Sequence, residues 1–326
     1  MFSCREYALL DFGDGRRLER FGEIVLDRPC PAAETFERAV PDSWAQADAR
    51  FEGRDELRGK WIDRRELPER WVVAHGRMRF ELKRTEFGHL GLFPEQAENW
   101  DWIVQLLSPL PLGEGKGEGS PAAVSAEESD GDCESAGPHP RPLSQRERGD
   151  TLRVLNLFAY TGGSTLAAAG GAEVVHVDAA ENVVAWARRN AELSGLVDAP
   201  IRWIAEDALK FVKRELKRGR RYDAVILDPP SYGHGPHGEV WRLAKHLPRL
   251  LDLCAELTDG RPRFMLLTCH TPGYDAESLR RMMLEKLGRE STAVAQPLMI
   301  QASDGRRLPS GVVVRCEAAS GLLPCQ

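Results

Sequence analysis

The stretch from Leu152 to Asp178 constrains the fold of this chain more than any other part of the sequence. It begins with an apolar run of strand type, continues through two glycines and a run rich in alanine, and ends in a second apolar run that leads to Asp178. We expect strand, glycine turn, helix, strand and acid, which is half of a nucleotide-binding α/β unit. The glycines let the backbone approach a ligand closely, and the acid can accept hydrogen bonds from two ribose hydroxyls.

The glycine turn does not have the spacing G-x-G-x-x-G, so a nicotinamide dinucleotide is disfavoured as its ligand. The same alternation recurs downstream. Strands are expected at 201–205, 222–227, 264–268, 292–300 and 312–315. Helices are expected at 181–193, 208–218, 239–257 and 276–287, with Pro248 kinking or splitting the third. This alternation predicts an α/β domain with a parallel sheet and helices on both faces.

Polar or reactive residues stand where successive strands are expected to end. They are Asp178, Asp207, Asp228 and Cys269. Ligands of open α/β sheets bind beyond the carboxyl ends of the strands. Three acids and a thiol at that edge therefore predict a site.

The first 107 residues have a different pattern. Short β-type runs occur at 7–11, 23–27, 71–74, 78–83 and 89–93, and Pro94 suits the first turn of a helix. We therefore divide the chain into a small β-rich N-terminal domain (1–93), a connecting helix (94–107), a low-complexity insert (108–150) and the α/β domain (151–320). Gly, Pro, Ser and acids dominate the insert, so we expect it to be disordered and dispensable for folding and activity.

The net charge of −6 comes mostly from the insert, which holds nine acidic and four basic residues. The rest is nearly neutral, so global charge does not favour a nucleic-acid partner. No apolar run is long enough to span a membrane, and the N-terminus lacks a signal-peptide pattern. Seven scattered cysteines without a C-x-x-C pair indicate reduced thiols in a cytoplasm. No spacing of His, Cys or Asp residues predicts a metal site, and the sequence does not indicate the oligomeric state.

The ordered motifs GLFPEQ, NLFAYTGG, HVDAAENVVAWARRNAELSGL, AEDALKFV, DPPSYG and LLTCHT, spread over residues 88–300, resemble the class I S-adenosylmethionine-dependent methyltransferases. The closer likeness is to the large-subunit ribosomal RNA methyltransferases that modify carbon 5 of cytosine. The resemblance implies a Rossmann-like seven-stranded sheet, transferase activity and S-adenosyl-L-methionine as the cofactor. The RNA-binding module that usually precedes the β-rich part in that family is not recognisable here.

Carried onto this sequence, the family pattern implies cofactor contacts at three strand ends. The glycine turn would hold the methionine moiety through Ala159, Tyr160, Thr161, Gly162 and Gly163. Asp178 would hold the ribose, and Asp207 with Ala208 would hold the adenine edge. Gln96, in GLFPEQ, matches a family position near the cofactor tail, where relatives usually show a different local pattern. Acids near a sulfonium cation are electrostatically favourable.

The acceptor is expected beside the motif Asp228-Pro229-Pro230-Ser231-Tyr232. The two prolines fix the backbone, the Asp228 carboxylate can hydrogen-bond a base edge, and Tyr232 can stack on the base. Carbon 5 of cytosine becomes nucleophilic only after a thiolate adds at carbon 6, and Cys269 is placed to supply that thiolate. Enzymes that methylate exocyclic amines carry a similar Asp-Pro-Pro followed directly by an aromatic residue, whereas Ser231 intervenes here.

RNA, and ribosomal RNA by resemblance, is the expected substrate, because a base must leave its stack to reach such a pocket. Basic residues at 77–84, 213–221, 242–249 and 303–311 are candidate RNA contacts; a solvated surface explains the first group equally well and is the more common interpretation of the other three. Two alternatives stay open. One is methylation of an exocyclic amine of RNA, or of a protein, through Asp-Pro-Pro. The other is a cofactor-binding module without catalysis.

Overall fold

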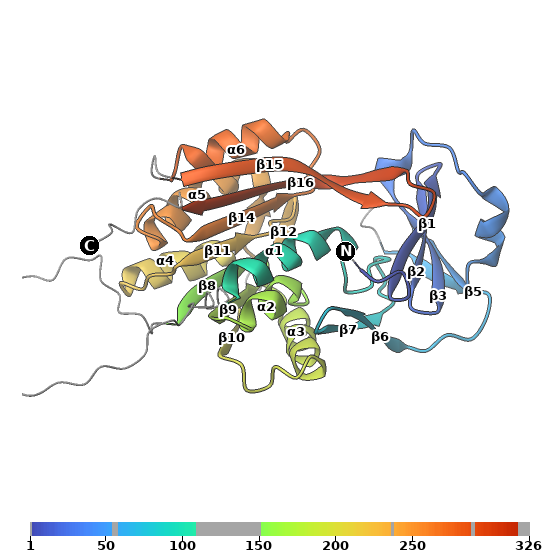
Figure 1. Cartoon of the computed structure of the whole chain (residues 1–326), viewed down its shortest axis with the longest axis horizontal. Helices are drawn as coiled ribbons and strands as arrows, with labels where there is room; N and C mark the ends of the chain where they lie inside the picture. Colours follow the sequence, from blue (N-terminus) through green and yellow to red (C-terminus); the bar gives the residue numbers. More distant parts are fainter. Residues whose placement is uncertain (1, 54–57, 109–150, 236–237, 288–290, 319–326) are drawn as a thin grey trace, which may run out of the picture.

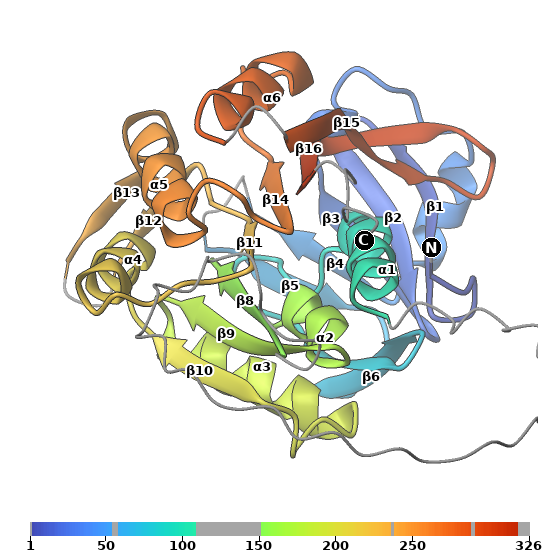
Figure 2. The same ribbon diagram turned by 60° about the vertical axis from the view of Figure 1, so that its left-hand side comes forward.

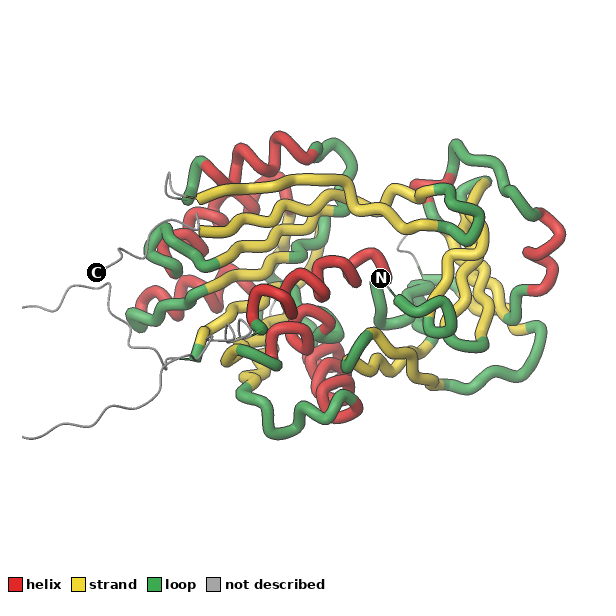
Figure 3. Tube along the Cα trace, in the orientation of Figure 1, coloured by secondary structure: helices red, strands yellow, loops and turns green. Residues whose placement is uncertain are grey.

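The computed structural model describes the chain except for residues 1, 54–57, 109–150, 236–237, 288–290 and 319–326. The expected disorder of the insert at 108–150 thus concerns residues that, apart from Ser108, lie outside the described ones. A large sheet flanked by helices occupies one end of the molecule, and a smaller β-rich part occupies the other (Figure 1). The tube view shows helices along the strands of the large sheet and mainly strands and loops in the smaller part (Figure 3).

Within the described residues the large sheet has seven strands, in the order β10-β9-β8-β11-β14-β16-β15. They are β8 (Leu152–Leu157), β9 (Ala172–Asp178), β10 (Ile201–Ala205), β11 (Ala224–Leu227), β14 (Phe264–Cys269), β15 (Ser291–Gln301) and β16 (Arg307–Ala318). The expected seven-stranded α/β sheet is confirmed, but it is not wholly parallel. β16 runs antiparallel to both β14 and β15. A short hairpin joins β15 to β16, and a hairpin connects only antiparallel strands.

Six α-helices in the described part of the chain cover the two faces of this sheet, with α1 to α3 on one face and α4 to α6 on the other (Figure 2). They are α1 (Ala97–Leu107), α2 (Gly163–Ala169), α3 (Glu181–Leu193), α4 (Ala208–Lys217), α5 (Leu243–Leu257) and α6 (Ala276–Leu284). Side chains alternate along each strand, so a strand contributes residues to the apolar core on each face of the sheet. Val154 of β8 packs in the same core as α2, whereas Leu155 packs in the core with α4.

The N-terminal part contains a five-stranded sheet and a separate hairpin. Its elements are β1 (Tyr7–Gly13), β2 (Arg16–Phe21), β3 (Ile24–Pro29), β4 (Ala49–Glu52), β5 (Lys60–Asp63), the hairpin β6 (Arg70–His75) and β7 (Met78–Lys83), and the 3-10 helices η1 (Pro31–Ala33), η2 (Pro41–Gln46) and η3 (Pro94–Gln96). The expected β-rich character of this part is therefore confirmed.

Two local expectations were wrong. No strand forms at 89–93, because Gly88 and Gly91 have φ of 76° and 90°, which an extended strand does not allow. The helix expected from residue 239 begins only at Leu243, because the preceding residues form β13 (Val240–Arg242), paired with β12 (Tyr232–His234). Pro248 lies inside α5 and does not split it.

The β15–β16 hairpin joins the two parts of the molecule. Ala302 in its loop forms a β-bridge with Leu9 of β1. Arg306 forms an ion pair with Asp11 and donates to the carbonyl oxygen of Phe12. Arg306, one of the candidate RNA contacts at 303–311, thus binds residues of the N-terminal sheet. In the part of the chain that the structure describes, no helix is long and apolar enough to cross a membrane.

Candidate active site

A cavity of about 440 Å³ lies at the carboxyl ends of β8 to β11. Its volume suits a small-molecule ligand of nucleotide size. Its ionisable lining includes His89, Asp178, Glu206, Asp207, Asp228, His234 and His270. The three acids that the sequence placed at strand ends therefore surround one cavity.

The turn after β8 is a strained piece of backbone. Phe158 and Tyr160, both bulky, have φ of 56° and 48°, in the left-handed region that side chains rarely adopt. The backbone N–H of Tyr160 donates to Oδ2 of Asp178 at 2.9 Å. The turn is therefore tied to the end of β9, and both residues line the cavity.

The glycines of the turn serve packing between elements. A Cβ on Gly163 would lie 2.4 Å from the indole of Trp100 in α1. Gly162 has φ of 92°, and a Cβ there would lie 3.2 Å from that of Ala187 in α3. Thr161 donates its hydroxyl to the carbonyl oxygen of Gly91 at 2.7 Å. These contacts hold α1 and α3 close to the turn.

A smaller cavity of about 30 Å³ adjoins the first and shares Phe93, Phe158, Tyr160 and Asp228 with it. Four of the five turn residues expected at the methionine moiety line this small cavity: Ala159, Tyr160, Thr161 and Gly163. Gln96 lines it as well. Gly162 is in the lining of neither cavity.

Asp178 lies at the end of β9 with its carboxylate partly used by the backbone. Its Oδ1 accepts from the N–H of Ala180 at 3.0 Å, and its Oδ2 accepts from Tyr160. Burial raises the pKa of Asp178 above its ordinary value, although these N–H groups act in the opposite direction. A carboxylate has about four lone-pair positions, and the N–H of Ala179 also acts on this one, so an acceptor position remains for a ribose hydroxyl.

The end of β10 supplies two acids. Asp207 caps α4, because its Oδ1 accepts from the N–H of Lys210 at 2.9 Å. Ala208, the first residue of α4, is buried in the cavity wall. Glu206 also lines the cavity and forms an ion pair with Arg214 at 2.5 Å. Sequence reasoning missed Glu206, although its place beside Asp207 was the available signal.

Asp228 lies just beyond β11 and accepts from three side chains. Thr268 Oγ1 donates to Oδ1 at 2.5 Å, and His270 Nε2 lies 3.3 Å from the same oxygen. Gln96 Nε2 donates to Oδ2 at 3.2 Å. Burial alone would raise the pKa of Asp228, but His270 and Thr268 outweigh it and hold the pKa below its usual value. Gln96, expected near the cofactor tail, thus also contacts the acceptor motif.

Cys269 is not in the lining of either cavity. Both of its neighbours, Thr268 and His270, contact Asp228, and side chains alternate along a strand, so its thiol faces the opposite side. It is 2% exposed and packs in the apolar core with α5 and α6. Burial raises the pKa of this thiol.

The remaining acceptor residues lie around the β12–β13 hairpin. Pro229 and Pro230 line the large cavity, and the carbonyl of Pro230 accepts from Trp241 Nε1 at 2.7 Å. Tyr232 is outside the lining, is 50% exposed, and meets the ring of His234 edge-on. Sequence reasoning also missed Phe158, which directly follows β8, and three lining residues away from the strand ends of the large sheet: His89, Phe93 and Trp241.

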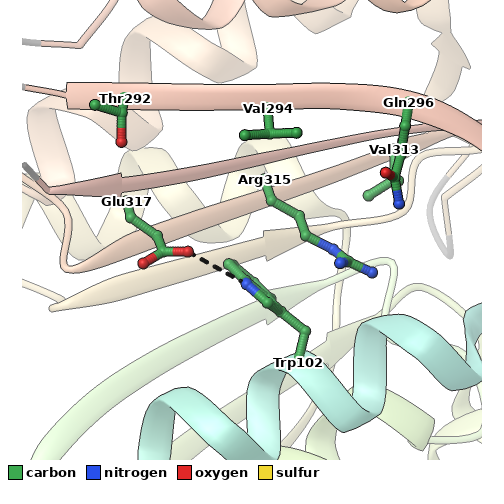
Figure 4. A pocket seen from close by; sticks show the side chains of 7 residues that line it. All are labelled: Trp102, Thr292, Val294, Gln296, Val313, Arg315 and Glu317. Atoms are coloured by element: carbon green, nitrogen blue, oxygen red, sulfur yellow. Dashed lines mark hydrogen bonds between the residues drawn. The ribbon is translucent and has the colours of Figure 1, made fainter.

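A separate cavity of about 170 Å³ lies between α1 and the β15–β16 edge of the sheet and shares no residue with the large one (Figure 4). It is lined by Trp102, Thr292, Val294, Gln296, Val313, Arg315 and Glu317. Among the described residues no group of three His, Cys, Asp or Glu could hold a metal ion.

Known proteins of similar sequence or fold indicate the family of this chain. A family model described as S-adenosylmethionine-dependent methyltransferase matches residues 141–295. The crystal structure of a SAM-dependent methyltransferase from Agrobacterium tumefaciens shares 34% sequence identity, with 96% of this chain and 90% of that one covered and a TM-score of 0.79. A Streptococcus mutans protein with 15% identity and a TM-score of 0.67, covering 96% of this chain and 75% of that one, shows the same fold.

Two curated relatives match the chain in part. Ribosomal RNA large subunit methyltransferase I of Aeromonas hydrophila is 32% identical over 178 residues, which are 50% of this chain and 42% of the relative. Ribosomal RNA large subunit methyltransferase K of Neisseria meningitidis is 32% identical over 159 residues, which are 46% of this chain and 42% of the relative. The match thus spans less than half the length of each relative.

The fold and the cavity define a class I methyltransferase. The chain belongs to the S-adenosylmethionine-dependent methyltransferases, as the Agrobacterium relative shows over nearly the whole of both chains. It is an enzyme of that class, and S-adenosyl-L-methionine is its cofactor. The residues fit this cofactor, because the cavity offers an acceptor position on Asp178 for a ribose and an acidic lining for a sulfonium.

Proposed function

We propose that this enzyme methylates a base of RNA, namely carbon 5 of a cytosine in ribosomal RNA of the large subunit. The names of the partial relatives from Aeromonas and Neisseria support the choice of RNA. The observation that carries the proposal is the position of Asp228-Pro229-Pro230 at a cavity that also contains Asp178. A base edge at Asp228 would lie beside the cofactor. A ribosomal substrate also implies that the enzyme works in the cytoplasm.

In this proposal the residues have separate roles. Ala159, Tyr160, Thr161, Gly162, Gly163, Gln96, Asp178, Asp207 and Ala208 hold the cofactor, which supplies the methyl group as a sulfonium. Asp228, Pro229, Pro230 and Tyr232 hold the base. The thiolate of Cys269 would add to carbon 6, carbon 5 would then attack the sulfonium methyl with S-adenosylhomocysteine as the leaving group, and removal of the carbon 5 proton by a base would expel the thiolate. Because Cys269 is buried behind the cavity wall, this role requires its side chain to turn toward the base.

A second candidate is methylation of an exocyclic amine. One observation favours it, since Asp228 lines the cavity and accepts hydrogen bonds, whereas Cys269 does not line it. An amine donating to Asp228 would need no thiol. We also propose the division of the chain into an N-terminal domain and a methyltransferase domain, although one apolar core contains residues of both, such as Phe21 and Val154.

Mass spectrometry of nucleosides from ribosomal RNA tests the function. RNA from a strain without the gene is compared with RNA from the same strain carrying the intact gene. We expect one 5-methylcytidine to be missing without the gene and restored with it. Loss of an N-methylated nucleoside instead would favour the second candidate, and an unchanged nucleoside profile would contradict an RNA substrate.

A further inference from the structure

A row of hydrogen-bonded side chains begins at the cavity of about 170 Å³ between α1 and the β15–β16 edge and ends at Asp228. Arg315 projects from β16 beside Trp102 of α1 (Figure 4). Its Nε and Nη2 donate to Oδ1 of Asn99 at 3.1 and 2.7 Å. Asn99 Nδ2 donates to Oε1 of Gln96 at 2.8 Å, and Gln96 Nε2 donates to Oδ2 of Asp228 at 3.2 Å. Asn99 is wholly buried and Gln96 is 5% exposed, so water does not replace these bonds.

The row has a direction, and Arg315 sets it. A guanidinium only donates, so the amide oxygen of Asn99 must face it. The Asn99 nitrogen then faces Gln96 and requires the Gln96 oxygen. The Gln96 nitrogen is therefore left to face Asp228, where it can only donate. Each amide can be flipped in isolation, but the guanidinium at one end leaves a single orientation for both.

On the other side of the carboxylate, His270 is held between two acceptors. Its Nε2 faces Oδ1 of Asp228, and its Nδ1 lies 2.6 Å from the carbonyl oxygen of Ser310 in β16. A carbonyl oxygen only accepts, so Nδ1 carries a proton, and the carboxylate accepts a hydrogen bond from the N–H of Nε2. His270 is thus an imidazolium. Charged and titratable groups around it are Asp228, Glu95 of η3 and the neighbouring thiol of Cys269.

We propose that Arg315, Asn99, Gln96 and His270 are positioning residues that hold Asp228 as an ionised carboxylate with one free position for accepting a hydrogen bond. This free position selects the base to be methylated, because it accepts a hydrogen bond from an amino or imino N–H of that base. Thr268 and His270 occupy Oδ1 and Gln96 occupies one position of Oδ2, which leaves one of about four lone pairs. This specificity rests on the proposed function, since it takes Asp228 as the residue that holds the base. The site would therefore exclude a base whose edge at Asp228 can only accept hydrogen bonds.

The test reverses the direction of the hydrogen bonds in the row with a substitution that keeps the shape of the side chain. In Asn99→Asp the new carboxylate still pairs with Arg315 but cannot donate, so Gln96 must turn its nitrogen toward residue 99 and its oxygen toward Asp228. Loss of a hydrogen bond to a charged group is expected to lower kcat/KM for the RNA by about 10- to 100-fold. Cofactor affinity, measured by calorimetry, should fall much less than kcat/KM for the RNA, because Gln96 is only one of the residues proposed to hold the cofactor and Asp178 is unchanged. Arg315→Met should lose less, because the Asp228 carboxylate still accepts from Gln96 and favours the native direction of both amides, and Arg315→Lys, which still only donates, should recover part of that loss.

A readout in the free protein separates this proposal from the proposed function. The pKa of His270, about 9 in the intact protein, is followed by NMR. Asn99→Asp and Arg315→Met both make the surroundings of Asp228 more negative, so both should raise that pKa. Glu317→Gln is the matched control, because Glu317 lines the same cavity as Arg315 outside the row and loses a negative charge, so this variant should not raise the pKa of His270 and should keep its activity.

The outcomes are distinct. An unchanged pKa of His270 in Asn99→Asp and Arg315→Met would overturn the positioning role whatever the substrate is. A raised pKa together with full RNA methylation by Asn99→Asp would overturn the role in base selection. A raised pKa together with no RNA methylation by the intact enzyme would leave the row in place and contradict the RNA substrate.

Discussion

The backbone of Gly311 lies so close to the ring of His270 that a Cβ at residue 311 would be 2.9 Å from Nδ1. The same Cβ would be 2.7 Å from the carbonyl oxygen of Cys269. Gly311 also has φ of 127°, in the region that favours glycine. The site therefore depends on a glycine in the β15–β16 hairpin, which also reaches the N-terminal sheet.

Replacement of Gly311 by alanine should destabilise the protein and displace His270. We expect a loss of about 1–3 kcal/mol in the free energy of unfolding from backbone strain alone, with the contacts to residues 269 and 270 adding to it. Urea unfolding measures the loss. Gly305→Ala is the control, because Gly305 has φ of 89° but open space around its Cβ position. Equal losses in the two variants would contradict a tight contact at His270.

The ion pair of His270 predicts a pH dependence of stability. Burial alone would lower the pKa of His270, but Asp228 more than offsets this and raises it to about 9 from 6.5. The stabilisation is therefore complete below pH 6.5 and is lost as the pH rises through about 9. Because the side chain is 36% exposed, we expect on the order of 1 kcal/mol after screening.

Urea unfolding of the intact protein and of His270→Gln, each below pH 6.5 and above pH 9, isolates this contribution. The difference between the two proteins should shrink as the pH rises, because the glutamine cannot lose a proton. A difference that stays constant over this range would show that His270 is not charged in the folded protein.

Cys269 separates the two proposed chemistries. Cys269→Ala should abolish methylation of carbon 5 while cofactor still binds, because only the thiol is lost from a buried position. Cys254→Ala, at another buried thiol with a pKa raised by burial, is the matched control and should keep its activity. Full activity of the Cys269 variant, measured as methyl groups incorporated into RNA, would move the acceptor to an amine.

Much of the α/β part was predictable because its signals are local. Apolar runs ending in Asp178, Asp207 and Asp228 predict strands whose tips meet at one edge, and the structure places all three acids around one cavity. Cys269 failed to reach that cavity for an equally local reason. Thr268 and His270 occupy the facing side of the strand, and the alternation of side chains was readable in LLTCHT.

What could not be predicted depends on contacts between distant residues. Gly163 is needed because Trp100, in a helix before the insert, lies against it. Gln96 reaches Asp228 across 132 positions in the sequence, and no local pattern indicates such a contact. Gly91 is required by the indole of Trp186, which would be 2.2 Å from a Cβ there, so an apparent strand became an irregular segment beside the site.

The central claim is that the cavity around Asp178 binds S-adenosyl-L-methionine. Calorimetry with S-adenosylhomocysteine on the intact protein, on Asp178→Ala and on Asp198→Ala, an exposed acid elsewhere, tests it most directly. We expect binding by the intact protein and by the Asp198 variant, and at least about a 100-fold loss of affinity for Asp178→Ala, since two ribose hydroxyls lose a charged partner. Unchanged affinity of the Asp178 variant would contradict the account.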